Sequence, residues 1–497
     1  AGITFFFGVV GFLLTFFFKM LAARYFGPHE FGVYSILEAI LGFTVAFASL
    51  GLSQGLPRYI PFYKTKKQVS LLRGYLTFIF SGTLISGILF GVLIFFLAPH
   101  ITAYLDFPQD LTFFLRMLAL VIPFRLIDRI IRKHFIAEKM MFLRGLSTQG
   151  VEKVILVLGV VWIMLSKGTL WWLAIVFFLS KLVPFIMDLG LYAYRVKPPL
   201  KGAKDFSVPE WWRYSLPLFF SGIFSLMILW TDSFVIGKVL DAGMLGIYSI
   251  VFSFGTVGLF FQKAFAPIFM PIITERHAEG DDAGVSFLFR QSAAWVFGLS
   301  FPILLIMILY GKPLLTLLYG AEYASGYVPL LIIACGALLN VSMGFGNVVL
   351  NMHRRTDITF YVNSGFAILN VALNVTLVPL LGISGAALSS AFSMGLIHVV
   401  FFSFARRYED LRFNWRYNLK FITAGVPSAL LGALVFRLPL VLALKIGLSL
   451  AVFGGLYLLL LLLFRTFTKE DFTLVLAVEK RLGLDLRLLK RVVKRFY

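Results

Sequence analysis

Charged residues are scarce in this chain, and so are the residue clusters that perform chemistry. Of its 497 residues, 14% are charged and 60% are hydrophobic, whereas soluble proteins carry about 25% charged residues. Cys335 is the only cysteine, so no disulfide can form within the chain. There is no Gly-x-x-x-x-Gly-Lys-Ser/Thr loop, which excludes a P-loop ATPase. No Cys or His cluster has metal-site spacing, so we expect no metal and no cofactor.

The sequence is instead dominated by long runs of apolar residues. Many exceed 18 residues, enough to cross about 30 Å of hydrocarbon as a helix. The expected fold class is an all-α polytopic membrane protein with about fourteen transmembrane helices, divided by charged residues or by Pro and Gly. The predicted spans are 3–24, 32–62, 72–98, 111–135, 145–166, 169–194, 213–238, 244–272, 286–310, 326–351, 357–381, 384–405, 418–436 and 439–464.

Lys and Arg residues gather in alternate loops. The loops rich in these cations are 64–73, 132–144, 195–213, 353–355 and 406–420. By contrast, Pro99–Asp110 and Leu381–Gly385 contain none. Loops rich in Lys and Arg stay in the cytoplasm, so we expect a multi-pass protein of the cell membrane with both termini cytoplasmic. The same rule accounts for most of the net charge of +21, and we expect no binding to nucleic acid.

The two halves of the chain share a short repeat. Gly32–Ile36 (Gly-Val-Tyr-Ser-Ile) matches Gly246–Ile250 (Gly-Ile-Tyr-Ser-Ile). Halves of equal topology are a known transporter plan, so we expect two pseudo-symmetric six-helix lobes around a central cavity, plus two extra C-terminal helices. The predicted parts are an N-terminal lobe 1–195, a cytoplasmic linker 196–212, a C-terminal lobe 213–405, additional helices 406–464 and a basic amphipathic cytoplasmic tail 465–497.

Three motifs resemble those of polysaccharide flippases. Ala23-Arg24-Tyr25-Phe26-Gly27-Pro28, followed by Phe31-Gly32-Val33-Tyr34-Ser35, is similar to the first hairpin of that family. Gly51–Tyr59 resembles the end of its second span, and Leu369–Ala387 resembles the junction of its eleventh and twelfth helices. The chain therefore resembles the polysaccharide transporter (Wzx-like) branch of the multidrug/oligosaccharidyl-lipid/polysaccharide (MOP) exporter superfamily.

The resemblance implies a flippase that moves an isoprenoid-diphosphate-linked oligosaccharide from the cytoplasmic to the outer leaflet. It implies alternating access driven by an H+ or Na+ gradient or by the substrate gradient, without ATP. The expected partners are this anionic lipid, membrane lipids and glycan polymerases or ligases. An ion-coupled multidrug antiporter and a peptidoglycan-precursor flippase of the same superfamily stay open as alternatives. An enzyme is disfavoured, because Asp106 and Asp110 are the only candidate acid pair in the Pro99–Asp110 loop.

Ionisable residues inside spans mark candidate sites, since a charge near the bilayer centre costs about 2.5–3.5 kcal/mol on insertion scales. Lys19 and Arg24 lie in the first span and Glu38 in the second. Lys19 and Arg24 are candidates for binding the anionic substrate, and Glu38 is a candidate for ion coupling. Alternatively, Lys19 and Glu38 form a structural ion pair. Arg58 is a further candidate substrate contact, and its alternative is interaction with lipid headgroups.

The second half offers Asp232 and Lys263. Asp232 is an isolated acid in an apolar run, which suggests a proton or sodium site unless it pairs with Lys238 or Lys263. Lys263, flanked by apolar residues, is a candidate substrate contact. Asn370 and Asn374 share one face of a span, where amides either join helices or bind sugar hydroxyls.

Arg125, Asp128, Arg129 and Arg132 follow helical spacing at the cytoplasmic end of the fourth span. Residues three and four apart lie on the same helical face, so this spacing places all four together. Arg binds phosphate oxygens through two parallel hydrogen bonds. Arg125 and Arg129 are therefore candidate diphosphate ligands, and the alternative is a solvated helix end.

Overall fold

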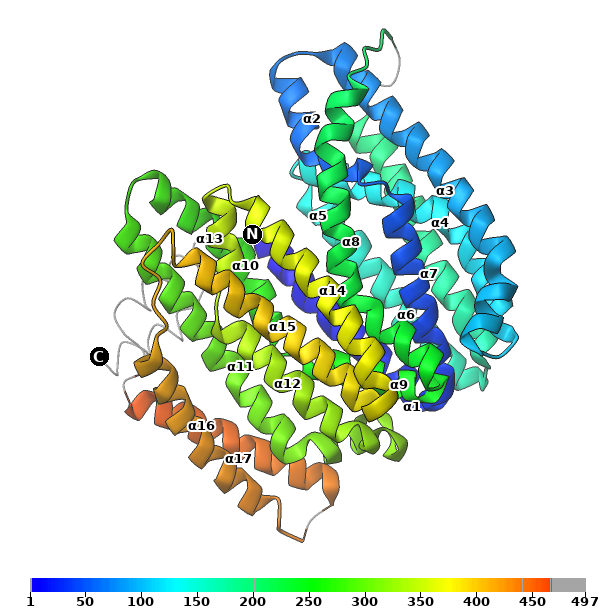
Figure 1. Ribbon diagram of the computed structural model, residues 1–497. Helices are drawn as coiled ribbons and strands as arrows, with labels where there is room; N and C mark the ends of the chain where they lie inside the picture. Colours follow the sequence, from blue (N-terminus) through cyan, green and yellow to red (C-terminus); the bar gives the residue numbers. More distant parts are fainter. Residues whose placement is uncertain (1, 198, 200–201, 440, 465, 467–497) are drawn as a thin grey trace. The chain divides into compact units, whose positions relative to one another are not determined.

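The computed structural model describes residues 2–197, 199, 202–439, 441–464 and 466 (Figure 1). Across these residues the regular structure is helical throughout. Of the predicted tail 465–497, only Thr466 falls within this range, so the amphipathic tail lies outside the described residues. The chain divides into two compact units. We call Phe6–Gly246 the N-terminal unit, and Ile247–Tyr497 with Ala1–Phe5 the C-terminal unit.

The N-terminal unit is built around a kinked first helix. Gly27 interrupts α1 with φ 75°, ψ 177°, a backbone geometry open to glycine, and Pro28 follows. One long helix thereby contains the predicted span 3–24 and the first part of the predicted span 32–62, which ends in η1 and α2. The helices of this unit are α1 (Gly2–Ala48), η1 (Leu52–Gly55), α2 (Leu56–Thr65), α3 (Val69–Leu105), α4 (Asp110–Ala137), α5 (Met141–Gly145), η2 (Leu146–Val151), α6 (Glu152–Ser166), α7 (Leu170–Leu191), η3 (Tyr192–Val196) and α8 (Val208–Val239).

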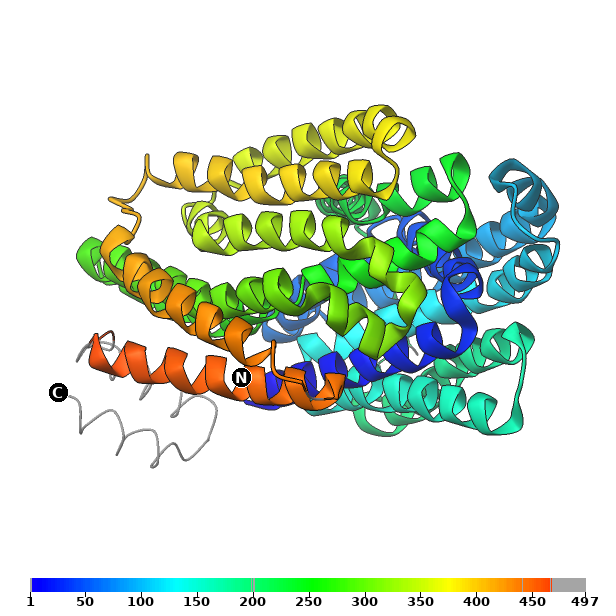
Figure 2. The same ribbon diagram turned by 90° about the horizontal axis from the view of Figure 1, so that it is seen from below.

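In the C-terminal unit, long helices pack in antiparallel pairs. Its helices are α9 (Ala242–Gly255, whose residues up to Gly246 belong to the N-terminal unit), α10 (Leu259–Ala278), α11 (Asp282–Tyr319), η4 (Ala321–Gly326), α12 (Tyr327–Ser342), α13 (Gly346–Met352), α14 (Thr356–Leu381), α15 (Ile383–Ala405), α16 (Trp415–Val435) and α17 (Leu442–Leu463). In both views α14 runs beside α15, and α16 beside α17 (Figures 1 and 2).

The two last helices, predicted as an addition to the lobes, pack on α11. Tyr457 of α17 donates a hydrogen bond of 2.8 Å to the Gly298 carbonyl of α11. Phe301 and Phe421 belong to one buried apolar cluster shared by α11, α16 and α17. This packing anchors the hairpin to the C-terminal unit through aromatic side chains.

Fewer helices pass as spans than the sequence predicts. By length and composition, eleven of the described helices could cross a membrane, or twelve if α9 and the start of α10, bent by 55°, form one broken span. Two differences have simple causes. The first predicted span and the first part of the second lie in α1, which counts as one span. Helix α4, the counterpart of predicted span 111–135, is absent from the set and carries four charges within residues 125–132. A multi-pass helical membrane protein is confirmed, whereas the count of fourteen stays a prediction.

The compact units differ from the predicted lobes. Helix α8, expected to open the C-terminal lobe, belongs to the N-terminal unit, where it packs on η1 and α3. Trp211 of α8 is buried and donates a hydrogen bond of 2.8 Å to the Tyr63 hydroxyl. Within the predicted linker, the Asp205 amide donates to the Ser70 carbonyl at 3.2 Å. The linker thus packs on the N-terminal unit, and the pseudo-symmetric lobes stay a prediction.

The repeated Gly-(Val/Ile)-Tyr-Ser-Ile segments meet in space. A Cβ atom added at Gly32 would overlap the Ala242 carbonyl oxygen, and one added at Gly246 would overlap the Pro28 carbonyl oxygen. Glycine at both positions allows the two backbones to approach this closely, as small residues do where membrane helices cross. The matched glycines of the repeat therefore form one helix contact.

This contact predicts a stability effect for Gly32→Ala. The added methyl group has no space, so we expect a loss of about 1–3 kcal/mol and a lower midpoint of thermal unfolding for the purified protein in detergent. Gly222→Ala on α8 is the control, because a Cβ there meets nothing within 4 Å. Equal unfolding midpoints for the two variants would contradict the close contact.

A candidate anion-binding pocket in the N-terminal unit

A cavity of about 280 Å³ opens beside α4. Its walls are Val45 of α1, six residues of α4, and two residues from the α5–η2 segment. The nine lining residues, which define what we call the arginine pocket, are Val45, Arg125, Asp128, Arg129, Arg132, Lys133, Ile136, Arg144 and Thr148. A water molecule takes about 30 Å³ of liquid volume, so the pocket has room for a hydrated anion.

Helical spacing explains why these α4 side chains meet in one cavity. Arg125, Asp128, Arg129 and Arg132 recur every three or four residues and so project from one face. All four line the arginine pocket. Lys133 and Ile136 extend the same wall by a further turn. The single face predicted from the sequence is therefore a wall of a cavity.

The buried Glu152 carboxylate lies within 4.0 Å of four cations. Glu152 is the first residue of α6 and is 4% exposed. Its Oε1 lies 2.6 Å from the Lys181 ammonium and 3.8 Å from that of Lys153. Its Oε2 lies 3.1 Å from Arg125 and 3.5 Å from Arg132. A charge this deeply buried requires such partners.

Two aspartates pair with the other guanidinium nitrogens of Arg132. Its Nη2 lies 3.0 Å from Asp128, and its Nε donates to Asp188 of α7 at 3.0 Å. Ser147 of η2 donates to the same Asp188 oxygen and accepts a hydrogen bond from Arg132 at 3.0 Å. Arg132 is thus held on several sides, and Arg125 and Arg132 face acids that offset their charge.

Three other cations of the pocket have no such acid. Within the described residues, no carboxylate oxygen lies within 4.0 Å of the side-chain nitrogens of Arg129, Lys133 or Arg144. Lys133 donates to the neutral Gln54 amide at 3.0 Å. Like charges in a partly enclosed space repel one another and attract anions more strongly than they would in bulk water. The pocket is therefore suited to a small multivalent anion.

A π-helical turn positions one side of the pocket. Residues Leu146–Val151 form η2, a π-helical segment between α5 and α6. Wider turns of this kind occur often at functional sites. Here the turn presents Thr148 to the pocket, directs Ser147 to Asp188, and is followed directly by Glu152. The same local backbone change thus serves both the pocket and the ion-pair network.

The predicted cations of α1 and α2 lie elsewhere in the N-terminal unit. Lys19 is half-buried in α1. Arg24 is exposed. Arg58 is exposed and its guanidinium lies 4.5 Å from the centre of the Tyr214 ring, a cation–π contact. None of these residues lines the arginine pocket.

Among the candidate site residues in the second half of the chain, some are buried and one is exposed. Asp232 is buried in α8. Lys263 of α10 is exposed, and no described carboxylate lies within 4.0 Å of it. Asn370 donates to Ser393 of α15 at 3.3 Å, and Asn374 donates to the Asn370 carbonyl at 3.0 Å. Both amides are fully buried, which favours the helix-joining alternative over sugar binding.

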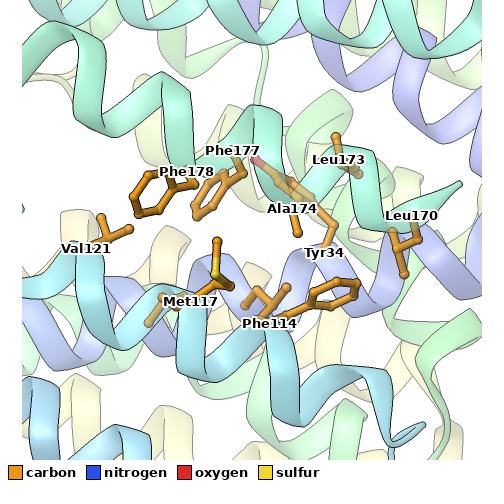
Figure 3. Close-up of a pocket in the computed structure, with 11 residues that line it drawn as sticks. Tyr34, Phe114, Met117, Val121, Leu170, Leu173, Ala174, Phe177 and Phe178 are labelled. Carbon is orange, nitrogen blue, oxygen red and sulfur yellow. The ribbon is translucent and has the colours of Figure 1, made fainter. Parts of the chain in front are cut away.

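A small apolar pocket lies beside an earlier part of α4, between residues 114 and 121 of that helix. It is lined by Tyr34 of α1, by Phe114 and Met117 of α4 and by Phe177 of α7, among other apolar side chains (Figure 3). Its volume of about 20 Å³ suits roughly one water molecule. A pocket of this size contributes to packing and is too small for a lipid tail.

The sequence analysis did not single out Glu152, Lys181 or Asp188 as site residues. Each lies in a predicted span, and the rule that ionisable residues in spans mark functional regions applies to all three. Their partners, however, lie on other helices and are 20 or more residues away in the chain. The spans could be identified from the sequence, but the pairing depended on which helices pack together.

Comparison with known families agrees with this fold. Residues 21–329 match the family described as "Polysaccharide biosynthesis protein". This match covers more than half of the chain, and the protein belongs to that family. The predicted resemblance to a polysaccharide family is thereby confirmed, and two relatives named as probable flippases agree with it.

Curated relatives are distant. The chain is 22% identical over 212 residues to a probable flippase, AglR, of Haloferax volcanii, covering 42% of this chain and 44% of that one. It is 22% identical over 222 residues to the probable low-salt glycan biosynthesis flippase Agl15 of the same organism, covering 44% and 45%. The matches thus span less than half of either flippase. An uncharacterized membrane protein of Methanocaldococcus jannaschii is 20% identical over 80% of this chain and 82% of its own length.

Solved structures share the fold. Lipid II flippase MurJ in an inward closed conformation has a TM-score of 0.72 at 15% identity, with 93% of this chain and 97% of that one covered. An inward-facing multidrug resistance MATE family transporter of the MOP superfamily has a TM-score of 0.64 at 12% identity, covering 80% and 94%. A MOP superfamily transporter from Pyrococcus furiosus has a TM-score of 0.56 at 14% identity, covering 82% and 94%.

The ion-pair network predicts a large effect for Glu152→Gln. Without its charge, the cations around residue 152 lose their common acid, and we expect about 3–5 kcal/mol of destabilisation, measured as a lower midpoint of thermal unfolding in detergent. The exposed Glu322→Gln is the matched control. Adding Lys181→Met to Glu152→Gln should restore part of the loss, because one buried uncompensated cation is removed. Unchanged stability of the single variant would refute a structural role for Glu152.

Proposed function

We propose that the protein is a flippase that moves an isoprenoid-diphosphate-linked oligosaccharide from the cytoplasmic to the outer leaflet. The observation that carries the proposal is the arginine pocket, in which Arg129, Lys133 and Arg144 have no acidic partner among the described residues. Each phosphate of a diphosphate diester is negatively charged. In this proposal the diphosphate enters the pocket and supplies negative charge to Arg129, Lys133 and Arg144, as carboxylates do for Arg125 and Arg132.

The geometry of arginine suits this ligand. A guanidinium group donates parallel hydrogen bonds that match two phosphate oxygens, whereas a lysine acts as a point charge. Arg129 and Arg144 come from different segments, α4 and α5, so together they can hold a diphosphate from two sides. Arg125 contributes from the same α4 face while bound to Glu152.

The position of the pocket agrees with loading from the cytoplasm. Arg144 belongs to the cation-rich loop 132–144, which the positive-inside rule predicts to be cytoplasmic. A headgroup that binds there would begin its transfer on the side where lipid-linked glycans are assembled. The sugar part of the substrate is supported by the family, described as polysaccharide biosynthesis, and by two relatives named as probable flippases, one of them for glycan biosynthesis.

Other charges would serve later steps of alternating access. We propose that Lys19, Arg24 and Arg58 in the N-terminal unit and Lys263 in the C-terminal unit each contact the anionic headgroup. Lys263 is exposed and without an acid within 4.0 Å among the described residues, which leaves it available for an anion. Glu38 and Asp232 are proposed to couple transport to H+ or Na+, because acids within spans serve as proton and ion sites in transporters.

The first test removes the cations that lack an acid. Arg129→Gln and Arg144→Gln should each weaken binding of an isoprenyl diphosphate to the purified protein by about tenfold or more, because a hydrogen bond to a charged group contributes about 1.5–3 kcal/mol. Binding is measured with radiolabelled isoprenyl diphosphate, and flipping with a fluorescent diphosphate-linked sugar in proteoliposomes. Arg129→Lys should retain part of the binding, since it keeps the charge and loses the paired geometry.

The control for this test is Arg195→Gln. Arg195 is an exposed cation of the same unit and stacks on Tyr194 outside the pocket. The Arg195→Gln variant should bind isoprenyl diphosphate and flip the labelled substrate as the wild type does. If Arg129→Gln and Arg144→Gln match the wild type in both assays while folding normally, the arginine pocket does not bind the diphosphate. A substrate panel that includes a peptidoglycan precursor and a lipophilic cation separates the two alternative transporters.

The second test concerns the C-terminal unit. Lys263→Ala should abolish flipping while protein level and binding at the arginine pocket stay normal, and Lys263→Arg should restore flipping in part. Lys312→Ala, which removes an exposed lysine of α11, serves as the control. Full flipping by Lys263→Ala would show that Lys263 takes no part in transport.

A further inference from the structure

Two histidines and a glutamate converge at one end of the C-terminal unit. The Nε2 of His353 lies 2.8 Å from Oε1 of Glu409, and the Nδ1 of His277 lies 3.5 Å from the same oxygen. One ligand atom from each of the three lies within 4.8 Å of the others. The two imidazole rings meet edge to face with their centres 4.5 Å apart. Among the described residues this is the one such group.

The three side chains come from separate elements. His277 lies in the last turn of α10, His353 follows α13, and Glu409 lies in the connection between α15 and α16. These positions are far apart in the chain, so the cluster exists only in the folded unit. A ligand held by all three would tie these elements together.

The cluster is protected from competing charges. Glu409 is buried, with 2% of its side chain exposed, while the histidines are partly exposed, which leaves a path for entry. The neighbouring Arg276 pairs with Asp281 at 3.1 Å, and among the described residues no Lys or Arg nitrogen lies within 4.0 Å of the Glu409 carboxylate. The Nδ1 atom of His277 is buried and makes no hydrogen bond to a described group; in the tautomer that carries its proton on Nε2, Nδ1 offers a lone pair to a metal.

We propose that His277, His353 and Glu409 form a binding site for a divalent transition metal, with Zn2+ as the expected ion. Two imidazole nitrogens and one carboxylate oxygen are a known zinc ligand set with a fourth position open to water. Tetrahedral bonds of about 2.0–2.1 Å place ligand atoms roughly 3.3 Å apart. The two distances to Glu409, 2.8 and 3.5 Å, lie on either side of that value, so small side-chain rotations suffice. Imidazole ligands disfavour Mg2+ and Ca2+.

The test uses the full-length protein, purified in detergent and stripped with a chelator. Isothermal titration with ZnCl2 should give one saturable site per chain, and Zn2+ should raise the midpoint of thermal unfolding. CoCl2 should give the visible absorption of a tetrahedral site, and excess MgCl2 should leave it unchanged. His353→Gln and His277→Gln should each weaken Zn2+ binding by at least about tenfold, since even the loss of a group that only hydrogen-bonds a metal ligand costs about 10–100-fold.

Control variants separate a specific site from surface binding and from misfolding. His100→Gln removes an exposed histidine outside the cluster and should bind Zn2+ as the wild type does. Glutamine at 277 or 353 can still donate a hydrogen bond to Glu409, so these variants should elute as folded protein on size exclusion without metal. Equal Zn2+ affinity in His353→Gln and His100→Gln, or no saturable binding by the wild type, would overturn the proposal and leave the cluster as an interhelical ion pair. Loss of flipping is not a readout here, so this result is independent of the transport tests.

Discussion

The buried carboxylate of Glu152 stabilises the cluster of cations in the N-terminal unit. Four cations approach this carboxylate, the nearest at 2.6 Å, in a place where an uncompensated charge would be strongly unfavourable. With Asp128 and Asp188 it offsets Arg125, Arg132 and Lys181. These acids thereby offset the charge of the cations that they contact. The other cations of the arginine pocket, Arg129, Lys133 and Arg144, have no acid within 4.0 Å among the described residues.

This difference between paired and unpaired cations gives one helix two roles. Along α4, Arg132 pairs with acids from α6 and α7 and joins the three helices, while Arg129 and Lys133 line the same cavity without an acid within 4.0 Å among the described residues. Neighbouring positions on the helix therefore differ in role because of what packs behind them. A structural ion pair and an anion site are usually competing interpretations of an arginine in a membrane span. In this unit both apply, at adjacent positions of one helix face.

Sequence reasoning identified the class of fold because hydrophobic length and charge alternation are local properties. It also placed Arg125 and Arg129 on one face, since helical spacing is local. It did not identify Glu152 as the common partner, because that depends on the packing of α4, α6 and α7. The same limit applies to His277, His353 and Glu409, whose spacing matches no metal motif and whose proximity arises from tertiary structure. The Gly32–Gly246 contact was visible as a repeat but not as a contact.

The charged face of α4 has a consequence for synthesis. Helix α4 leaves the ribosome before Glu152 and Asp188 have been made. At that moment Asp128 is the acid that pairs with Arg125 and Arg132, and a charge without a partner is costly in hydrocarbon. On its own, α4 is not among the helices apolar enough to pass as a span. We therefore expect its stable insertion to depend on α6 and α7, which carry Glu152 and Asp188.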